Sequence, residues 1–379
     1  MKKLGSSKRA LYRCIDFISS LFLARADPNS AARVSSLDPK RILLVEFYGI
    51  GDLVLMSEAL DPLKQEWPDA EVWIVGSSFA KHLYAHDQRV HEVMVLDVPW
   101  ILKGSRYNVF KWPWRALRGL VSTLRALDFD IAFGRPDVPM NILLYASRAK
   151  VRLGYDVPGG SRLLTHRLRN EQKSTDYEGM VWRGYLEALG INSSEVRTQL
   201  IPNGDYDEEV RGILGSFSGA VGNRPLVGIH AGASDMLKCW PLDRFRYLAE
   251  TLSEQARIIW FVDHLHFSSG LDDNDRVIEV SANFPVFMNL LAECELLVCN
   301  DSGPMHLAAA LGTHTVAIFR PEIVERFAPR KACTAVVDDE RPERPGGARF
   351  ATRDIACIEK ITVDDVLEAV LRHLEHGAS

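Results

Sequence analysis

The segment CNDSGPMHLAAALG, residues 299–312, constrains the fold of this chain more than any other, because it sets polar groups between a buried strand and a helix. Apolar residues from Leu296 to Val298 predict the strand, Ser302 suits a helix N-cap, and Leu307–Leu311 predicts the helix. Thr315–Phe319 then predicts a second strand, so the segment completes a β-α-β unit. The chain is therefore expected to contain an α/β sheet.

The start of this helix is a candidate anion site. Free N–H groups in the first turn of a helix attract phosphate, and open α/β sheets bind ligands at the carboxyl ends of their strands. Asp301, Ser302, Gly303 and His306 all fall at that position. The alternative is purely structural, in which Ser302 only caps the helix and His306 only forms hydrogen bonds within a packed first turn.

Alternating strands and helices run through the rest of the chain and predict two α/β halves. A turn-rich stretch at 199–224, with a short acidic helix inside it, separates the halves. We predict an N-terminal extension at 1–38, domains at 39–203 and 204–355, and a helical tail at 356–379. The expected strands are 41–47, 71–75, 92–96, 131–133, 152–153, 226–229, 257–262, 296–298 and 315–319, and the expected helices are 53–66, 177–189, 242–255, 286–293 and 363–376.

Length and composition favour a soluble enzyme with two sizeable cores, since 47% of the 379 residues are hydrophobic and 25% are charged. No apolar run reaches the roughly 20 residues that a membrane-spanning helix needs. The six cysteines include no C-x-x-C pair, so they are predicted to be reduced thiols of a cytoplasmic protein. Neither a disulfide framework nor a zinc site is expected.

Two basic zones interrupt a chain whose net charge is −5. Residues 1–26 carry a net charge of +5, with apolar residues at helical spacing. They predict a short helix that either touches an anionic membrane or packs on its own domain, and a secretory signal is the competing interpretation.

The second zone, residues 98–127, holds six basic and no acidic residues, interleaved with aromatic ones. Such a mixture predicts a surface that meets lipid headgroups, sugars or phosphates, and the alternative is an ordinary solvated helix face. No nucleic-acid partner is expected, because the chain is acidic and contains no recognisable nucleic-acid module. The basic residues of this zone are Lys103, Arg106, Lys111, Arg115, Arg118 and Arg125.

The loop after the first predicted strand reads YGIGD. Gly49 and Gly51 allow the backbone to approach a ligand closely, and Asp52 stands where the next helix begins. A carboxylate at this place can remove a proton from an attacking hydroxyl group. The alternative is that Asp52 only caps the helix and interacts with the helix dipole.

The corresponding loop of the second half reads HAGASDMLKCWP. Ser234 and the glycine-containing backbone are suited to an anion, and Lys238 can neutralise a departing diphosphate. The alternative is a surface lysine beside the Trp-Pro entry to a helix.

Taken together, the three loops resemble the heptosyltransferase family of nucleotide-sugar glycosyltransferases, and the resemblance covers about residues 40–373. RILLVEFYGIGDLVLMSEALDPLKQEWPDAEVWIVG is similar to the family's opening strand, Gly-Asp turn, helix and YPDA turn. VGIHAGASDMLKCWPLDRF resembles its HPGA…KRWP loop, and NDSGPMHLAAALGTHTVAIF resembles its DTG…HLAAALG signature. The tail CIEKITVDDVLEAV resembles its C…IT…DV ending. The motifs are far more specific jointly than singly.

The resemblance implies a GT-B fold, with an acceptor-side and a nucleotide-sugar-binding Rossmann-like domain facing one another across a cleft. It implies that Asp52 is the catalytic base, that Asp301 binds sugar hydroxyls and that His306 completes the phosphate or sugar pocket. Ser234, Lys238, Ser302 and Gly303 are then expected to hold the donor diphosphate. The expected acceptor-side residues are Gly49, Gly51, Lys103, Arg106, Lys111 and Arg115.

The activity that the resemblance implies is inverting transfer of a heptose, or a related sugar, from an ADP-sugar to a hydroxyl of a bacterial surface glycan such as the lipopolysaccharide core. No metal or other cofactor is expected. The protein is expected in the cytoplasm, with peripheral contact at the inner face of the cytoplasmic membrane. The alternatives are a transferase for another nucleotide sugar, a nucleotide-sugar epimerase on the same fold, and a non-catalytic nucleotide-binding membrane adaptor.

Overall fold

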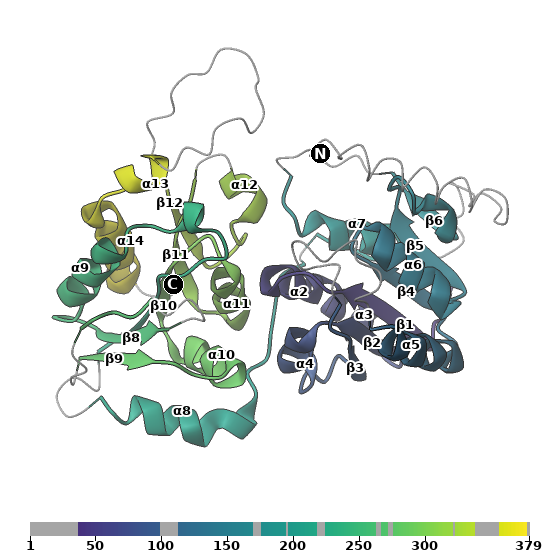
Figure 1. Ribbon diagram of the computed structural model, residues 1–379, viewed down its shortest axis with the longest axis horizontal. Coiled ribbons are helices and arrows are strands. Elements are labelled where there is room, and N and C mark those ends of the chain that lie inside the picture. The colour runs from purple at the N-terminus through teal and green to yellow at the C-terminus, as the bar shows by residue number, and fades with distance from the viewer. Residues whose placement is uncertain are drawn as a thin grey trace, which may run out of the picture. The chain divides into compact units, whose positions relative to one another are not determined.

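The computed structural model describes residues 37–98, 113–169, 176–194, 196–217, 224–262, 267–271, 276–320, 323–337 and 356–376. The chain forms two compact units that divide between Thr198 and Gln199 (Figure 1). Within the described ranges, no helix has the length and apolar character needed to cross a membrane.

The first unit is built on a six-stranded sheet in which every neighbouring pair of strands is parallel. The strand order is β3-β2-β1-β4-β5-β6, which is the order of a dinucleotide-binding Rossmann fold. Its strands are β1 (Arg41–Glu46), β2 (Glu71–Gly76), β3 (Glu92–Val95), β4 (Ile131–Gly134), β5 (Val151–Tyr155) and β6 (His166–Leu168). Its helices are α2 (Ile50–Met56), α3 (Leu60–Glu66), α4 (Ser78–Tyr84), α5 (Trp114–Leu127), α6 (Val138–Ser147) and α7 (Met180–Ala188).

The second unit repeats this topology with the order β12-β11-β10-β7-β8-β9, again with parallel pairs throughout. Its strands are β7 (Leu226–His230), β8 (Arg257–Phe261), β9 (Val277–Val280), β10 (Leu296–Asn300), β11 (His314–Ile318) and β12 (Cys333–Val336). Its helices are α8 (Asp207–Leu214), α9 (Leu242–Leu252), α10 (Phe284–Glu293), α11 (Gly303–Leu311), α12 (Val324–Phe327), α13 (Ala356–Lys360) and α14 (Val363–His376).

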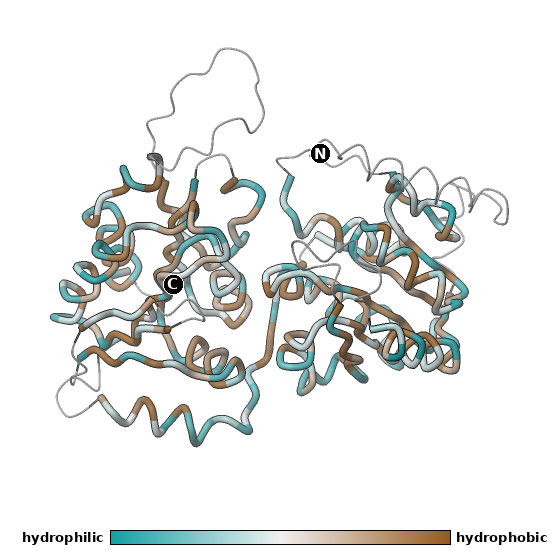
Figure 2. Tube along the Cα trace, in the orientation of Figure 1, coloured by the Kyte–Doolittle hydropathy of each residue, from teal (hydrophilic) through white to brown (hydrophobic). Residues whose placement is uncertain are grey.

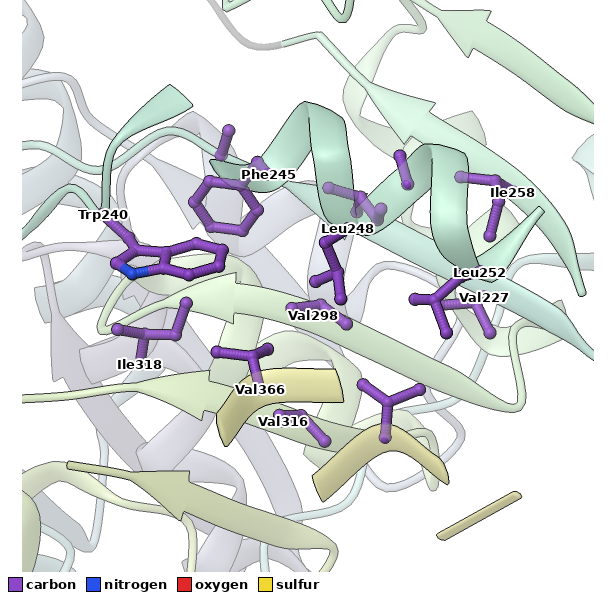
Figure 3. Close-up of a cluster of buried hydrophobic side chains, with 14 of the residues drawn as sticks. Val227, Trp240, Phe245, Leu248, Leu252, Ile258, Val298, Val316, Ile318 and Val366 are labelled. Carbon is purple, nitrogen blue, oxygen red and sulfur yellow. The ribbon is translucent and has the colours of Figure 1, made fainter. Parts of the chain in front are cut away.

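Both sheets are covered on their two faces, as parallel sheets require, and their central strands are almost wholly apolar (Figure 2). On one face of the second sheet, Trp240 and Phe245 pack beside Val298 and Ile318, and Val366 of α14 joins the same cluster (Figure 3). The Trp240 indole donates a hydrogen bond to the Ile361 carbonyl oxygen over 2.9 Å. The C-terminal helices therefore contribute to the core of the second unit.

The structure confirms the predicted α/β class and all of the predicted strands, with ends that shift by one or two residues. The acidic helix expected within 199–224 is α8. The predicted start of the helix at Leu53 is wrong, because α2 begins at Ile50 after Gly49 as the N-cap residue. The elements that were not predicted are α4, α6, α12, β6, β9 and β12, whereas α5 lies within the second basic zone, for which a solvated helix was the alternative.

Candidate functional site

Each sheet has one topological switch point, where strands are added outward in both directions. It lies between β1 and β4 in the first unit and between β7 and β10 in the second. Open α/β sheets bind ligands outside the carboxyl ends of the two strands at this point. Asp52 follows β1, Ser234 and Lys238 follow β7, and Asp301 follows β10 directly. The predicted residues of each unit thus lie at the switch point of that unit.

Asp52 is the third residue of α2, so the interpretation of Asp52 as the N-cap residue is wrong. Its Oδ2 accepts a hydrogen bond from the Gly49 N–H over 3.2 Å, which supports the helix start. Its Oδ1 accepts a hydrogen bond from Nη1 of Arg135. Gly51 precedes Asp52 within the helix. The carboxylate is about one quarter exposed, so it is both fixed in orientation and accessible.

Arg135 was not predicted as a site residue, although it follows the end of β4. Gly134 allows this placement, since a Cβ atom there would lie 2.5 Å from the Val45 carbonyl oxygen. Nη2 of Arg135 pairs with Glu178 at 2.7 Å, and the guanidinium lies 4.9 Å from the Tyr48 ring centroid. Burial opposes the charged guanidinium, but the three carboxylates around it outweigh burial and raise the pKa of Arg135.

The third carboxyl group near Arg135 belongs to Glu46, the last residue of β1, which is fully buried. Its Oε1 accepts the Tyr48 N–H at 2.9 Å, whereas its Oε2 lies 3.8 Å from Nη1 of Arg135 and makes no hydrogen bond with any described residue. Burial raises the pKa of Glu46 to about 8; Arg135 opposes this shift, and Asp52 adds to it. Burial therefore disfavours the ionised form of Glu46, although Arg135 lies nearby.

In the second unit, Asn300 joins the two loops at the switch point. This fully buried side chain donates from Nδ2 to the Ala231 carbonyl oxygen at 2.7 Å and accepts the Trp240 N–H on Oδ1 at 2.9 Å. The loop after β7 is thereby fixed beside the end of β10. Asn300 was not among the predicted site residues, although the asparagine at the end of an apolar strand is a visible signal in the sequence.

Lys238 and Asp301 form an ion pair within this arrangement, with 2.6 Å between Nζ and Oδ2. Asp301 is nearly buried, and about one quarter of the Lys238 side chain is exposed. Asp235 accepts a hydrogen bond from the Leu237 N–H over 3.2 Å and so caps the short 3-10 turn Met236–Lys238 that holds the lysine. The interpretation of Lys238 as a plain surface lysine is wrong. Ser234 is exposed in the same loop.

Ser302 is the N-cap residue of α11, as predicted, but its side chain makes no capping hydrogen bond. Its Oγ is buried and has no hydrogen-bond partner among the described residues. Gly303 opens the helix, and His306 is buried in the first turn. Gly312 ends α11 in the left-handed conformation with φ of +92°, which favours glycine. The start of α11 therefore combines the Gly303 N–H with an unsatisfied hydroxyl group.

The structure brings Lys238, Asp301, Ser302, Gly303 and His306 together around β10 and α11, and Gly49 and Asp52 together around α2. Arg115 is exposed in the first turn of α5 and, within the described ranges, makes no hydrogen bond or ion pair with either group. Lys103, Arg106 and Lys111 lie outside the described residues. No group of three or more His, Cys, Asp or Glu side chains in the described ranges is arranged to hold a metal ion.

Comparison with known proteins assigns the chain to a family. Residues 117–348 match the model of glycosyltransferase family 9 (heptosyltransferase). Lipooligosaccharide heptosyltransferase 2 of Haemophilus ducreyi is 26% identical over 308 residues, which is 74% of this chain and 83% of that protein.

Solved structures show the same fold. The family 9 glycosyl transferase of Veillonella parvula superposes with a TM-score of 0.75 at 19% identity, over 90% of this chain and 99% of that one. An E. coli heptosyltransferase with ADP-2-deoxy-2-fluoro heptose gives a TM-score of 0.65 at 16% identity, over 88% of this chain and 99% of that one. These similarities confirm the predicted GT-B type of fold, with two Rossmann-like units. The chain belongs to glycosyltransferase family 9, the heptosyltransferase family, and is a glycosyltransferase.

Proposed function

We propose that this protein transfers a heptose, or a related sugar, from an ADP-sugar to a hydroxyl group of a bacterial surface glycan such as the lipopolysaccharide core. The transfer is a single displacement that inverts the anomeric centre. Such a reaction needs one carboxylate that takes the proton of the acceptor hydroxyl, together with positive groups that stabilise the leaving diphosphate. The first unit contributes the carboxylate, and the second unit contributes the donor site.

Asp52 is the proposed base. Oδ1 faces Arg135 and Oδ2 faces the Gly49 N–H, so the carboxylate is held in one orientation. The exposed quarter of the side chain leaves room for an acceptor hydroxyl. Fixed orientation matters because a base acts only within hydrogen-bond reach of the proton that it removes.

The observation that best supports the donor site is the buried and unpartnered Ser302 hydroxyl at the start of α11. A buried hydroxyl without a partner is costly, and a diphosphate oxygen would satisfy it. The Gly303 N–H at the start of α11 favours the same anion, whereas Pro304 has no N–H and the Met305 N–H bonds to the Ser302 carbonyl oxygen. In this proposal, Lys238 neutralises the leaving diphosphate, Asp301 binds sugar hydroxyls, and Ser234 and His306 complete the pocket.

ADP-heptose is the proposed donor because a structural relative in E. coli is known with ADP-2-deoxy-2-fluoro heptose. The proposed acceptor is a glycolipid of the lipopolysaccharide type, since the curated relatives are lipooligosaccharide and lipopolysaccharide heptosyltransferases. A glycolipid acceptor places the enzyme at the cytoplasmic face of the inner membrane. Gly49, Gly51 and the basic zone that includes Arg115 are the proposed acceptor-side elements. The transfer requires no metal in this proposal, and no nucleic acid takes part.

The test is acceptor-dependent ADP release by the purified enzyme and its Asp52→Asn variant. Loss of a general base lowers turnover by roughly 100- to 10,000-fold. Binding of ADP, measured by calorimetry, is expected to be unchanged, because the donor residues belong to the second unit. Asp38→Asn, an exposed carboxylate of the first unit, is the matched control. Full turnover by Asp52→Asn would remove Asp52 from the mechanism.

The same assay separates the other activities. An isomer that forms from the donor alone, without acceptor, would identify an epimerase. Binding of ADP without turnover over a panel of donors and acceptors would identify a nucleotide-binding adaptor. A thermal-shift screen of ADP-, GDP-, UDP- and dTDP-sugars identifies the donor, because a ligand of the native state raises its apparent stability.

A further inference from the structure

The outer face of the α5–α6 layer in the first unit is strongly basic. Residues 113–169 hold ten basic and four acidic residues, a net charge of +6, whereas the whole chain carries −5. The remainder of the chain therefore carries −11. This local excess of positive charge, in a chain whose net charge is negative, suits an anionic partner.

The sequence of α5 separates the two faces of the helix. Five of its apolar residues pack against the core of the first sheet: Leu117, Leu120, Val121, Leu124 and Leu127. Arg115, Arg118 and Arg125 recur at helical spacing on the exposed face, and α5 contains no acidic residue. The arginine side chains therefore form one outward row.

α6 extends this surface, because α5 and α6 cover the same face of the sheet (Figure 1). Arg125 donates from Nε to the Ala146 carbonyl oxygen at 2.9 Å, which brings the arginine row beside the end of α6. Ile142 and Tyr145 lie one helical turn apart on α6 and are 45% and 42% exposed. At the start of α5, Trp114 is 50% exposed. The surface therefore combines large apolar side chains with cations.

The positive charges of this surface are not neutralised from within. Arg115, Arg118, Arg125 and the exposed Arg148 form no ion pair with any carboxylate in the described ranges. Elsewhere in the same stretch, Lys150 pairs with Asp130 and Arg135 pairs with Asp52 and Glu178, so these two cations are already compensated. The four exposed arginines of the α5–α6 surface thus keep their positive charge uncompensated by the described carboxylates.

We infer that the α5–α6 surface docks the enzyme on an anionic lipid bilayer, with the arginines at the phosphate headgroups and Trp114 and Tyr145 at the interface. Tryptophan and tyrosine favour the membrane interface, and a basic side chain near an anionic leaflet contributes roughly 1 kcal/mol, or about a fivefold change in binding. This inference deepens the membrane contact of the proposed function by naming the surface and the lipid chemistry.

The test is co-sedimentation of the full chain with phosphatidylcholine vesicles that either contain or lack phosphatidylglycerol, without donor or acceptor. Arg115→Gln/Arg118→Gln removes two exposed charges and should weaken binding to the anionic vesicles by about 25-fold, since the two fivefold effects multiply. A higher salt concentration should also weaken binding of the parent protein to the anionic vesicles, because salt screens exposed charges. Arg211→Gln/Lys331→Gln, which removes two exposed charges of the second unit, is the matched control and should bind like the parent.

Brominated lipids locate the surface independently. They should quench part of the tryptophan fluorescence of the parent, and Trp114→Phe should lose that part. Unchanged vesicle binding by Arg115→Gln/Arg118→Gln, or equal weakening by the control pair, would overturn the inference. So would binding to a soluble anionic polymer but not to vesicles. Vesicle binding requires no turnover, so its failure leaves sugar transfer standing, and failure of sugar transfer leaves the docking surface standing.

Discussion

The buried carboxyl group of Glu46 makes the stability of the first unit dependent on pH. Its pKa is raised from 4.5 to about 8, chiefly by burial. Below pH 4.5 the group is protonated in both the folded and the unfolded chain. Between pH 4.5 and 8 the unfolded chain ionises while the folded chain keeps its proton. The contribution of Glu46 to stability is therefore full below pH 4.5 and is lost as the pH rises toward 8.

Glu46→Gln removes this dependence. Glutamine keeps an oxygen that can accept the Tyr48 N–H but cannot ionise. One pKa unit corresponds to about 1.4 kcal/mol, so a shift of about 3.5 units corresponds to roughly 5 kcal/mol. As the pH rises from 4.5 to 8, the free energy of unfolding of the variant should therefore increase relative to that of the parent by roughly 5 kcal/mol. Placing an amide beside Arg135 has a cost that is the same at both pH values, so this cost cancels when the two pH values are compared.

Hydrogen exchange of the β1 amides measures this free energy, because core strands of a unit exchange through its unfolding. Leu43, Leu44 and Val45 are fully buried and report on the first unit alone. Glu66→Gln, which removes an exposed carboxyl group of the same unit, is the control and should show no such trend. If Glu46→Gln and the parent differ by the same free energy of unfolding at pH 5 and at pH 8, Glu46 is ionised in the folded protein, with Arg135 as its partner.

Two further predictions concern the second unit. Lys238→Gln removes a charge-assisted contact of about 1.5–3 kcal/mol, so ADP should bind about 10- to 100-fold more weakly in calorimetry, whereas Lys331→Gln should bind normally. Undiminished affinity in Lys238→Gln would exclude the lysine from the diphosphate site. Asn300→Ala leaves the Trp240 N–H and the Ala231 carbonyl without their partner, at roughly 1–3 kcal/mol each. Urea unfolding should show that loss, and a change below about 0.5 kcal/mol would contradict the structural role of Asn300.

The local features of the second switch point could be read from the sequence. Ser302 and Gly312 bracket α11 because a polar side chain favours the N-cap and glycine favours the left-handed C-cap. Parallel strands are covered on both faces and are therefore apolar throughout. The apolar run Leu296–Val298 predicted a buried strand on this ground, and β10 is buried. The donor-side residues next to this helix were therefore within reach of sequence reasoning.

The interaction partners of the site residues could not be predicted from the sequence. Arg135 lies 83 positions from Asp52, Lys238 lies 63 from Asp301, and Asn300 lies 69 from Ala231. These pairs meet only because β4 is placed beside β1 and β10 beside β7. Periodicity identifies a strand but not its neighbour in the sheet, which depends on how the covering helices pack. Glu46 shows the same limit, since the sequence placed it within the first strand but not beside Arg135 in a fully buried position. The sequence by itself determined the central strands, the two ends of α11 and the family motifs, whereas the tertiary structure decided which charges meet and which carboxyl group is buried.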